Sequence, residues 1–381
     1  MTSRVKVGRV RPITVPTPRR TPRHRSAIAN TTVVDVFCGV GGVTHGFVRE
    51  GFRVAAGLDV DTSCRYAYET NNPGSVFVAK SVDELDVADT LRAFYPAGHT
   101  KVLVGCAPCQ PFSSNNTKGK QNGDWKLLSV FCDLVARVEP DVVSMENVTR
   151  LATFHGGEVF EGFLNRLESL GYHVAWRDVN CPDYGIPQNR KRLLLLASRL
   201  GPIEFLPPTH TPETYRTVRE VLSELPPLKA GQRHEADPLH WAAGLTERNL
   251  QRIRASRPDG TWRDWDETLV ADCHRKSTGK SFPSVYGRMS WDRPSPTITT
   301  QFYGFGNGRF GHPEQDRAIS LREGALLQTF PRTYQFVPPN GRWTFENLGR
   351  HIGNAVPVDL ARVVAKSVAV HLASQASPVA G

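Results

Sequence analysis

The sequence has no apolar run long enough to cross a bilayer, and no apolar segment follows its basic N-terminal residues. A membrane-spanning helix needs about 18 consecutive apolar residues, and a secretory signal needs an apolar core behind its positive charges. Cysteines are few, and their odd number, seven, and irregular spacing argue against a disulfide framework. We therefore expect a protein of the reducing cytoplasm without a membrane partner.

Metal and phosphate motifs are also missing. Cys106 and Cys109 form a C-x-x-C pair, but no second pair stands at zinc-ribbon spacing, so a metal site is only a weak alternative. The glycine-rich turn at 39–42 lacks both the G-x-G-x-x-G spacing and the Lys-Ser or Lys-Thr pair with which an ATPase holds phosphate. These absences favour a nucleoside ligand without phosphates, and no metal.

Acidic residues are absent from residues 1–30, which hold eight basic residues. Because the whole chain carries a net charge of +10, subtracting these eight charges leaves only +2 for the rest. The segment is rich in Pro, Thr and Arg, a composition typical of disordered extensions. It is either a solvated tail or an arm that binds nucleic-acid phosphates, and salt would weaken such an arm.

Apolar runs alternate with amphipathic segments up to about residue 200, which predicts an α/β fold with a Rossmann-like, doubly wound, parallel sheet. Beyond residue 200 the periodicity is poor until about residue 320, and Pro, Trp, Arg and Gly are frequent, which indicates a smaller irregular lobe. The expected strands lie at 33–37, 54–58, 101–105, 141–145 and 193–197. The expected helices lie at 43–50, 62–70, 127–138, 159–170 and 357–373, and regular structure resumes at 321–327.

Polar and glycine residues follow the first two expected strands. Gly39, Gly41 and Gly42 come after the first strand, where glycine lets a ligand approach the backbone closely. Asp59 ends the second strand and can accept hydrogen bonds from a ribose. A glycine turn alone is weak evidence for a nucleoside site, so these residues support such a site only in combination with the motifs that follow.

Cys109 lies on a turn framed by Pro108 and Pro111, directly after an expected strand. Most cysteines pack as small apolar residues, which is what we expect of the others near the core. Cys109 differs because the prolines fix its turn and polar residues surround it. A free thiol is mostly protonated at neutral pH, so a positive neighbourhood would make it a better nucleophile.

Charged residues adjoin two later strands. Glu146 follows one of them, and because the carboxyl ends of parallel strands share one edge of a sheet, it can lie beside Cys109. There it can act as an acid, a base or a hydrogen-bond anchor, although a lone loop glutamate is more often simply solvated. Gln188, Arg190 and Arg192 alternate before the last strand and so share a face. They can orient an anion or a base carbonyl, or form a solvated basic edge.

In this order, the segments closely resemble the motifs of the cytosine-C5 DNA methyltransferase family. The resemblance covers about residues 32–200 and 290–365, and six ordered motifs make chance convergence very improbable. The matching segments are 35–42, 105–113, 146–148, 188–192, 322–331 and 353–357. In addition, residues 293–299 are similar to the segment that often closes the variable region in bacterial members.

The resemblance implies a site-specific enzyme that methylates carbon 5 of a flipped cytosine in double-stranded DNA, within a restriction-modification or phage modification system. Cys109 would attack carbon 6 of the base. Glu146 would hold the ring nitrogen and the exocyclic amine, and Arg192 would contact the base carbonyl, with Arg190 and Gln188 in support. Covalent addition breaks the aromaticity that makes the carbon a poor nucleophile, and the base must leave the stack to be reached.

The resemblance also implies S-adenosyl-L-methionine as cofactor, with S-adenosyl-L-homocysteine as product. The family usually places an acid against the adenine amine, whereas Ser81 stands at that position here, with Asp83 two residues on. Either residue can take this role. The cofactor contacts carried over by position are Phe37, Cys38, Gly39, Gly41, Gly42, Asp59, Val60, Pro108, Asn354 and Val356.

The resemblance divides the chain into a basic tail (1–30), a catalytic and cofactor-binding domain (31–200 with 345–381) and a target-recognition domain (201–344). Basic residues of the irregular lobe would contact phosphates and guanines. These are Arg252, Arg254, Arg257, Arg263, Lys276, Lys280 and Arg288.

The resemblance further implies a monomer in the bacterial cytoplasm or nucleoid, with double-stranded DNA as partner. It is also compatible with a cognate restriction endonuclease that acts on the same DNA sequence. One alternative is an RNA substrate, as in the tRNA-methylating branch. The Arg-rich recognition stretch and the absence of that branch's Cys-Phe-Thr sequence argue against it. Another is a non-catalytic DNA-binding relative, but both Cys109 and Glu146 are present.

Overall fold

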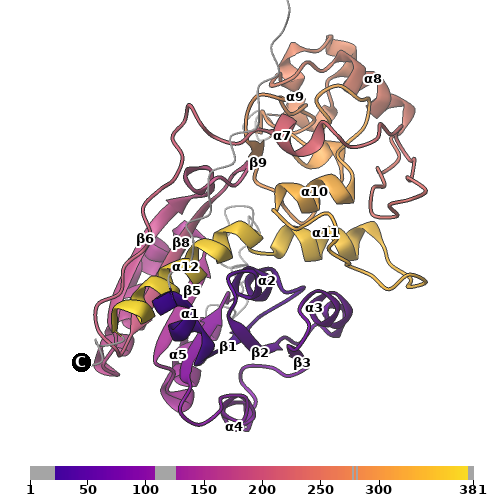
Figure 1. Ribbon diagram of the computed structural model, residues 1–381. Coiled ribbons are helices and arrows are strands. Elements are labelled where there is room, and N and C mark those ends of the chain that lie inside the picture. Colours follow the sequence, from indigo (N-terminus) through magenta and orange to yellow (C-terminus); the bar gives the residue numbers. More distant parts are fainter. Residues whose placement is uncertain (1–21, 108–125, 277–278, 280–281, 376–381) are drawn as a thin grey trace, which may run out of the picture.

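The structure, a computed structural model, describes residues 22–107, 126–276, 279 and 282–375. A larger lobe is built around a sheet, and a smaller lobe of short helices and loops lies beside one end of it (Figure 1). Helix α11 lies between the lobes, and α12 runs back along the sheet (Figure 1). None of the helices in the described ranges is long and apolar enough to span a membrane.

Seven strands form the main sheet in the order β3-β2-β1-β4-β5-β8-β6. This arrangement confirms the predicted fold class, a Rossmann-like doubly wound sheet with a smaller irregular lobe. The strands are β1 (Thr31–Val36), β2 (Arg53–Leu58), β3 (Val76–Val78), β4 (Thr100–Gly105), β5 (Val142–Asn147), β6 (His173–Asn180) and β8 (Lys191–Ser198).

The prediction that the sheet is entirely parallel is wrong, because β8 runs antiparallel to both β5 and β6. Asn180 at the end of β6 pairs with Lys191 at the start of β8, so only residues 181–190 connect the two strands. A parallel connection needs a crossover of a dozen or more residues, whereas a short connection joins antiparallel strands. The short β3 and the edge strand β6 were not among the strands expected from the sequence.

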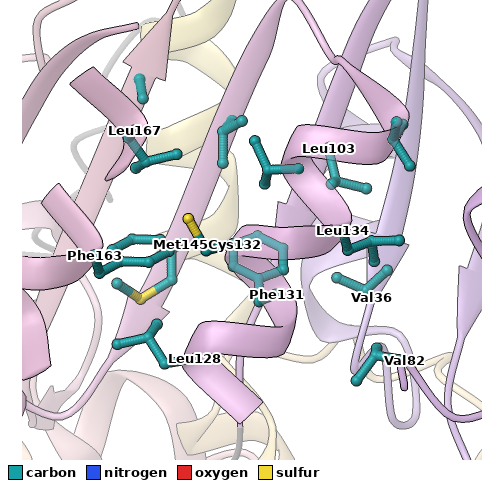
Figure 2. Packing of buried hydrophobic residues seen from close by; sticks show 14 of the residues in the cluster. Val36, Val82, Leu103, Leu128, Phe131, Cys132, Leu134, Met145, Phe163 and Leu167 are labelled. Atoms are coloured by element: carbon teal, nitrogen blue, oxygen red, sulfur yellow. The ribbon is translucent and has the colours of Figure 1, made fainter. Parts of the chain in front are cut away.

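Helices cover both faces of the sheet because neighbouring strand residues point to opposite sides. Val33, Val102 and Val104 pack toward α1, α2 and α12, whereas Val36 and Leu103 pack toward α4, α5 and α6. Figure 2 shows the second layer, in which the α5 and α6 side chains meet the sheet. The helices are α1 (Pro22–Ala29), α2 (Gly42–Arg49), α3 (Arg65–Asn71), α4 (Val87–Arg92), α5 (Lys126–Val138), α6 (Glu158–Ser169) and α12 (Val358–Gln375).

The smaller lobe has its own apolar cluster around Trp262 and Trp265, and a second cluster joins it to the larger lobe. The joining cluster unites Val40 and Tyr68 with the buried face of α10. The glycine turn after β1 and the C-terminal helices therefore share one core. The remaining elements are β7 (Gln188–Asn189), α7 (Val218–Leu222), α8 (Glu247–Ala255), α9 (Asp272–Arg275), β9 (Ser295–Pro296), α10 (Leu321–Leu327) and α11 (Phe345–Asn354).

Candidate active site

A cavity of about 410 Å³ lies where the carboxyl ends of β1, β2, β4 and β5 meet the end of α11. This is the edge at which doubly wound sheets bind ligands, and the volume falls in the usual range for small-molecule sites. Its lining residues are Phe37, Cys38, Gly39, Val40, Gly42, Val43, Leu58, Asp59, Val60, Asp61, Cys64, Lys80, Ser81, Val82, Cys106, Ala107, Leu127, Glu146, Val148, Arg190, Arg192, Arg350, His351, Asn354, Ala355 and Val356.

The turn after β1 is shaped by unusual backbone conformations. Phe37 has a φ of +60°, which costs a non-glycine residue on the order of 1–3 kcal/mol and is typical of functional sites. A β-carbon at Gly42 would lie 2.6 Å from the Val356 carbonyl oxygen, so glycine lets the C-terminal segment close one side of the cavity. Gly41 does not line the cavity, because a β-carbon there would meet Tyr68 and Asn72.

Asp59 lies in the cavity at the end of β2 and is oriented by two backbone amides. The Gly39 N–H donates to Oδ2 at 2.8 Å, and the Asp61 N–H donates to Oδ1 at 2.9 Å. Each carboxylate oxygen keeps a further lone pair for a ribose hydroxyl. Val60 beside it is 67% exposed, which leaves an apolar surface that a purine base can cover. The carboxylate and this apolar wall fit the nucleoside half of the expected cofactor.

Ser81, and not Asp83, lines the cavity. The Asp83 side chain is exposed, whereas Ser81 is partly buried, and its N–H donates to Glu84 Oε1 at 2.8 Å. Of the two residues that the sequence leaves open for the adenine contact, only Ser81 lies on the wall of the cavity.

Asp61, Cys64 and His351 are close enough to hold a metal ion, the sole such set in the described part of the chain. However, the Arg350 guanidinium donates to Asp61 Oδ2 at 2.7 Å and occupies this carboxylate. Although burial opposes it, hydrogen bonds from Ser63 and Arg350 lower the pKa of Asp61 to about 2. Burial raises the pKa of the Cys64 thiol, which disfavours the thiolate that a metal needs. The set is therefore better suited to join α11 to the β2 turn than to bind a metal.

Glu146 and Arg192 face each other at the other end of the cavity. Arg192 Nε lies 2.7 Å from Glu146 Oε1, and the two side chains are only 13% and 14% exposed. The N–H is not aligned with this oxygen, so Oε1 is a buried carboxylate oxygen that accepts no hydrogen bond. A ligand that donates a hydrogen bond to this oxygen would remove the free-energy cost of leaving it buried and unsatisfied.

Arg190 lines the same cavity but is almost fully buried. Its guanidinium donates to the Ile298 carbonyl at 3.1 Å and to Gln188 Oε1 at 3.4 Å. Gln188 itself is fully buried and does not reach the cavity wall. The structure thus brings together Glu146, Arg190 and Arg192, with Gln188 behind Arg190.

The strand that leads to Cys109 ends beside Glu146. Gly105 pairs with Met145, and Asn147 Nδ2 donates to the Ala107 carbonyl at 3.2 Å. Cys109 and Pro108 themselves lie outside the described residues. The chain is nevertheless fixed at Ala107 on the same sheet edge as the glutamate.

Of the remaining predicted cofactor residues, Phe37, Cys38, Gly39, Gly42, Asn354 and Val356 all line the cavity. Cys106, Arg350 and His351 also line the cavity, although the sequence did not point to them. Arg350 lies four residues before Asn354, and this helical spacing could have placed both on one face. Cys106 stands three residues before Cys109, but was considered only as a metal ligand.

Arg288 does not fit its predicted contact with DNA. It is 5% exposed, and its guanidinium donates to the carbonyls of Ile253, Ser256, His312 and Gln315 and pairs with Asp316. It therefore stabilises the smaller lobe from within. Arg254 and Arg257 also have carboxylate partners but remain exposed, and Lys280 lies outside the described residues.

The chain is similar to known proteins over most of its length. The family model of the C-5 cytosine-specific DNA methylases matches residues 31–369. The chain is 57% identical to the Type II methylase M.HgiDII of Herpetosiphon aurantiacus, over 88% of this chain and 94% of the relative. It is 30% identical to the Type II methyltransferase M1.HphI of Haemophilus parahaemolyticus, over 88% and 86%.

Solved structures agree at the level of the fold. A DNMT2 variant of Spodoptera frugiperda has a TM-score of 0.59 at 15% identity, over 89% of this chain and 99% of that one. Dnmt2 of S. pombe has a TM-score of 0.55 at 16% identity, over 91% and 99%. With the family match over residues 31–369, the chain belongs to the family of C-5 cytosine-specific DNA methylases and uses S-adenosylmethionine as methyl donor.

Proposed function

We propose that the chain methylates carbon 5 of one cytosine within a specific double-stranded DNA sequence, as the modification enzyme of a Type II system. The observation that carries this proposal is the Glu146–Arg192 pair in the same cavity as the Asp59 turn. A nucleoside-type cofactor and a polar heterocycle can thus occupy adjacent parts of one site. The relatives named as Type II enzymes support the biological context.

Glu146 and Arg192 suit the two edges of a cytosine. The carboxyl group of Glu146 would contact ring nitrogen 3 and the exocyclic amine, and Arg192 would donate to the carbonyl at carbon 2. Holding the ring nitrogen in its protonated form withdraws electrons from carbon 6 and so prepares it for nucleophilic attack. Arg190, fixed by Gln188, would keep Arg192 and the base correctly oriented.

Cys109 would supply the nucleophile. Its thiolate sulfur would bond to carbon 6 as the 5,6 double bond opens, and carbon 5 would form the bond to the methyl group. Loss of the carbon-5 proton would restore the double bond and expel the thiolate. When bound, S-adenosylmethionine supplies the electrophilic methyl group.

The target base would have to leave the helix. The cavity is bounded by strand ends and by α11, and an atom inside a stacked duplex cannot reach its walls. We therefore propose base flipping. We also propose that the enzyme works as a monomer in the bacterial cytoplasm and protects sites that a cognate endonuclease cuts.

Bisulfite sequencing of DNA from a bacterial host that expresses the chain tests this function. We expect conversion-resistant cytosines confined to one short sequence, and none with the Cys109→Ala variant. A parallel assay offers labelled S-adenosylmethionine with duplex DNA and with tRNA. Label found in tRNA alone would replace the proposal with the RNA alternative.

A further inference from the structure

Two buried glutamine amides join three segments that are far apart in the sequence. Gln188 in β7 and Gln328 after α10 are both fully buried, and Gln188 Nε2 donates to Gln328 Oε1 at 2.8 Å. Gln188 Nε2 also lies 3.2 Å from the Leu327 carbonyl. A buried amide that makes its full set of hydrogen bonds holds its partners in one arrangement.

On one side, Gln328 holds the end of α11. Its Nε2 donates to the Ile352 carbonyl at 2.7 Å and to the Ala355 carbonyl at 2.9 Å. Ile352 lies in the last turn of the helix and Ala355 is its C-cap residue, so neither carbonyl has a partner within the helix. Asn354, Ala355 and Val356 of this segment line the cofactor end of the cavity, so Gln328 fixes their position.

On the other side, Gln188 holds Arg190. Its Oε1 accepts from the Ile298 N–H at 2.9 Å and from Arg190 at 3.4 Å, and Arg190 donates to the Ile298 carbonyl. The segment that contains Ile298 also touches α11 directly, since a β-carbon at Gly353 would lie 2.4 Å from the carbonyl of the next residue, Thr299. Helices α10 and α11 lie next to each other where the two lobes meet (Figure 1).

We propose that Gln328 is a positioning residue that couples cofactor binding to target-base binding through Gln188 and Arg190. A cofactor that fixes Asn354–Val356 would fix the Gln328 amide, and through Gln188 it would hold Arg190 ready at the base end. Because coupling between two ligands is reciprocal, DNA should tighten cofactor binding as much as cofactor tightens DNA binding. This inference rests on the proposed function, since it assumes a target base beside Arg190 and Arg192.

The test measures the dissociation constant of S-adenosylhomocysteine by calorimetry, with and without a duplex that carries the site mapped by bisulfite sequencing. We expect the duplex to tighten binding to the wild type by about 5- to 150-fold, the usual range of coupling between sites. Gln328→Met fills a similar volume without the hydrogen bonds and should reduce this factor to about twofold or less. A change of stability alone would not alter this ratio.

Thr329→Val is the matched control. Thr329 Oγ1 accepts from the Asp359 N–H at 2.9 Å, so the variant removes a neighbouring hydrogen bond and leaves the glutamine pair intact. The duplex should tighten S-adenosylhomocysteine binding to this variant by the same factor as in the wild type. If Gln328→Met does not fold, Gln328→Asn, whose amide is too short to reach both sides, replaces it with the same expected loss.

Two results would overturn the inference. One is a folded Gln328 variant that keeps the wild-type factor, and the other is a wild type that methylates the duplex yet shows no tightening. The second result separates the two proposals, because methylation would uphold the proposed function while the coupling failed.

Discussion

Glu146 and Arg192 illustrate how single residues set the chemistry of this site. Both are largely buried, and each limits the desolvation cost of the other in the absence of a base. The unaligned contact leaves Glu146 Oε1 without a hydrogen bond, so a base that donates to it would satisfy a group the protein leaves unsatisfied. The arrangement of the pair therefore favours the binding of a ligand over the stability of the unliganded protein.

Glu146→Gln should lower the methylation rate by about 10²- to 10⁴-fold, the usual contribution of a positioned acid or base. Glutamine keeps the shape but cannot protonate the ring nitrogen. The dissociation constant of S-adenosylhomocysteine should stay within about twofold, because the cofactor half of the cavity is unchanged. Glu161→Gln, an exposed change on α6, is the control. Full activity of the Glu146 variant would remove this residue from the mechanism.

Ser81→Ala tests which residue contacts the adenine amine. The wild type should bind S-adenosylhomocysteine more tightly than its analogue without the 6-amino group, by about 2- to 12-fold for one hydrogen bond. Ser81→Ala should bind both equally, whereas Asp83→Ala should behave as the wild type. Loss of the preference in the Asp83 variant instead would assign the contact to that residue.

At the scale of elements, α10 shows how polar groups stabilise the smaller lobe. Ser320 and Glu323 form a capping box at its first turn. Arg317 donates to both oxygens of Glu323 at 2.7 and 2.8 Å, and the two side chains are 0% and 1% exposed. A second pair, Arg322 with Asp237, attaches the same helix to the loop between α7 and α8.

Arg317→Met should lower the free energy of unfolding by about 3–5 kcal/mol, because it leaves the Glu323 carboxylate buried and unpaired. Urea denaturation at neutral pH measures this loss. Arg254→Met removes an exposed ion pair with Asp316 in the same lobe and should cost about 1 kcal/mol or less. Equal effects of the two variants would contradict the structural role of the buried pair.

The helices and strands with strong apolar periodicity could be predicted from the sequence, and those without it could not. Strands β1, β2, β4 and β5 each contain an apolar stretch and are largely buried on both faces, so they stand out. Strand β6 lies at a sheet edge, where only Val179 among its residues is fully buried, and β3 is only three residues long. The direction of β8 depends on the length of the connection, which apolar patterns do not reveal.

The candidate site could be predicted where its residues end a strand, because parallel strand ends converge on one edge. Asp59 and Glu146 could be predicted in this way, and the structure places both of them on the wall of one cavity. Arg350 and His351 reach the cavity only through the packing of α11 against the β2 turn, which no local pattern encodes. Arg288 was misjudged because sequence does not distinguish a buried arginine from an exposed one.

At the scale of the whole molecule, positive charge is unevenly distributed along the chain. The chain from residue 22 onward is nearly balanced in charge. Six of the basic residues lie before residue 22: Arg4, Lys6, Arg9, Arg11, Arg19 and Arg20. Helix α1 begins at Pro22 and packs on α12. A chain cut at residue 22 therefore keeps every helix and strand in the described ranges, and a DNA-binding role of the preceding segment can be tested with it.

A chain that begins at residue 22 should bind duplex DNA more weakly and with a smaller salt dependence. For every phosphate that the segment neutralises, its removal should reduce the slope of log K against log salt by about 0.9. The full-length chain with all six residues changed to Gln should match the truncation. Unchanged slopes in both would identify the segment as a solvated tail.

The most direct test of the central claim is covalent trapping. A duplex carries 5-fluorocytosine at the mapped target position, and the enzyme is incubated with it and S-adenosylmethionine. Because fluorine cannot leave carbon 5 as a proton does, an enzyme attached at carbon 6 stays attached. We predict a denaturation-resistant protein–DNA adduct with the wild type and none with Cys109→Ser. Equally little adduct from both proteins, under conditions in which the wild type methylates the unmodified duplex, would contradict attack by Cys109.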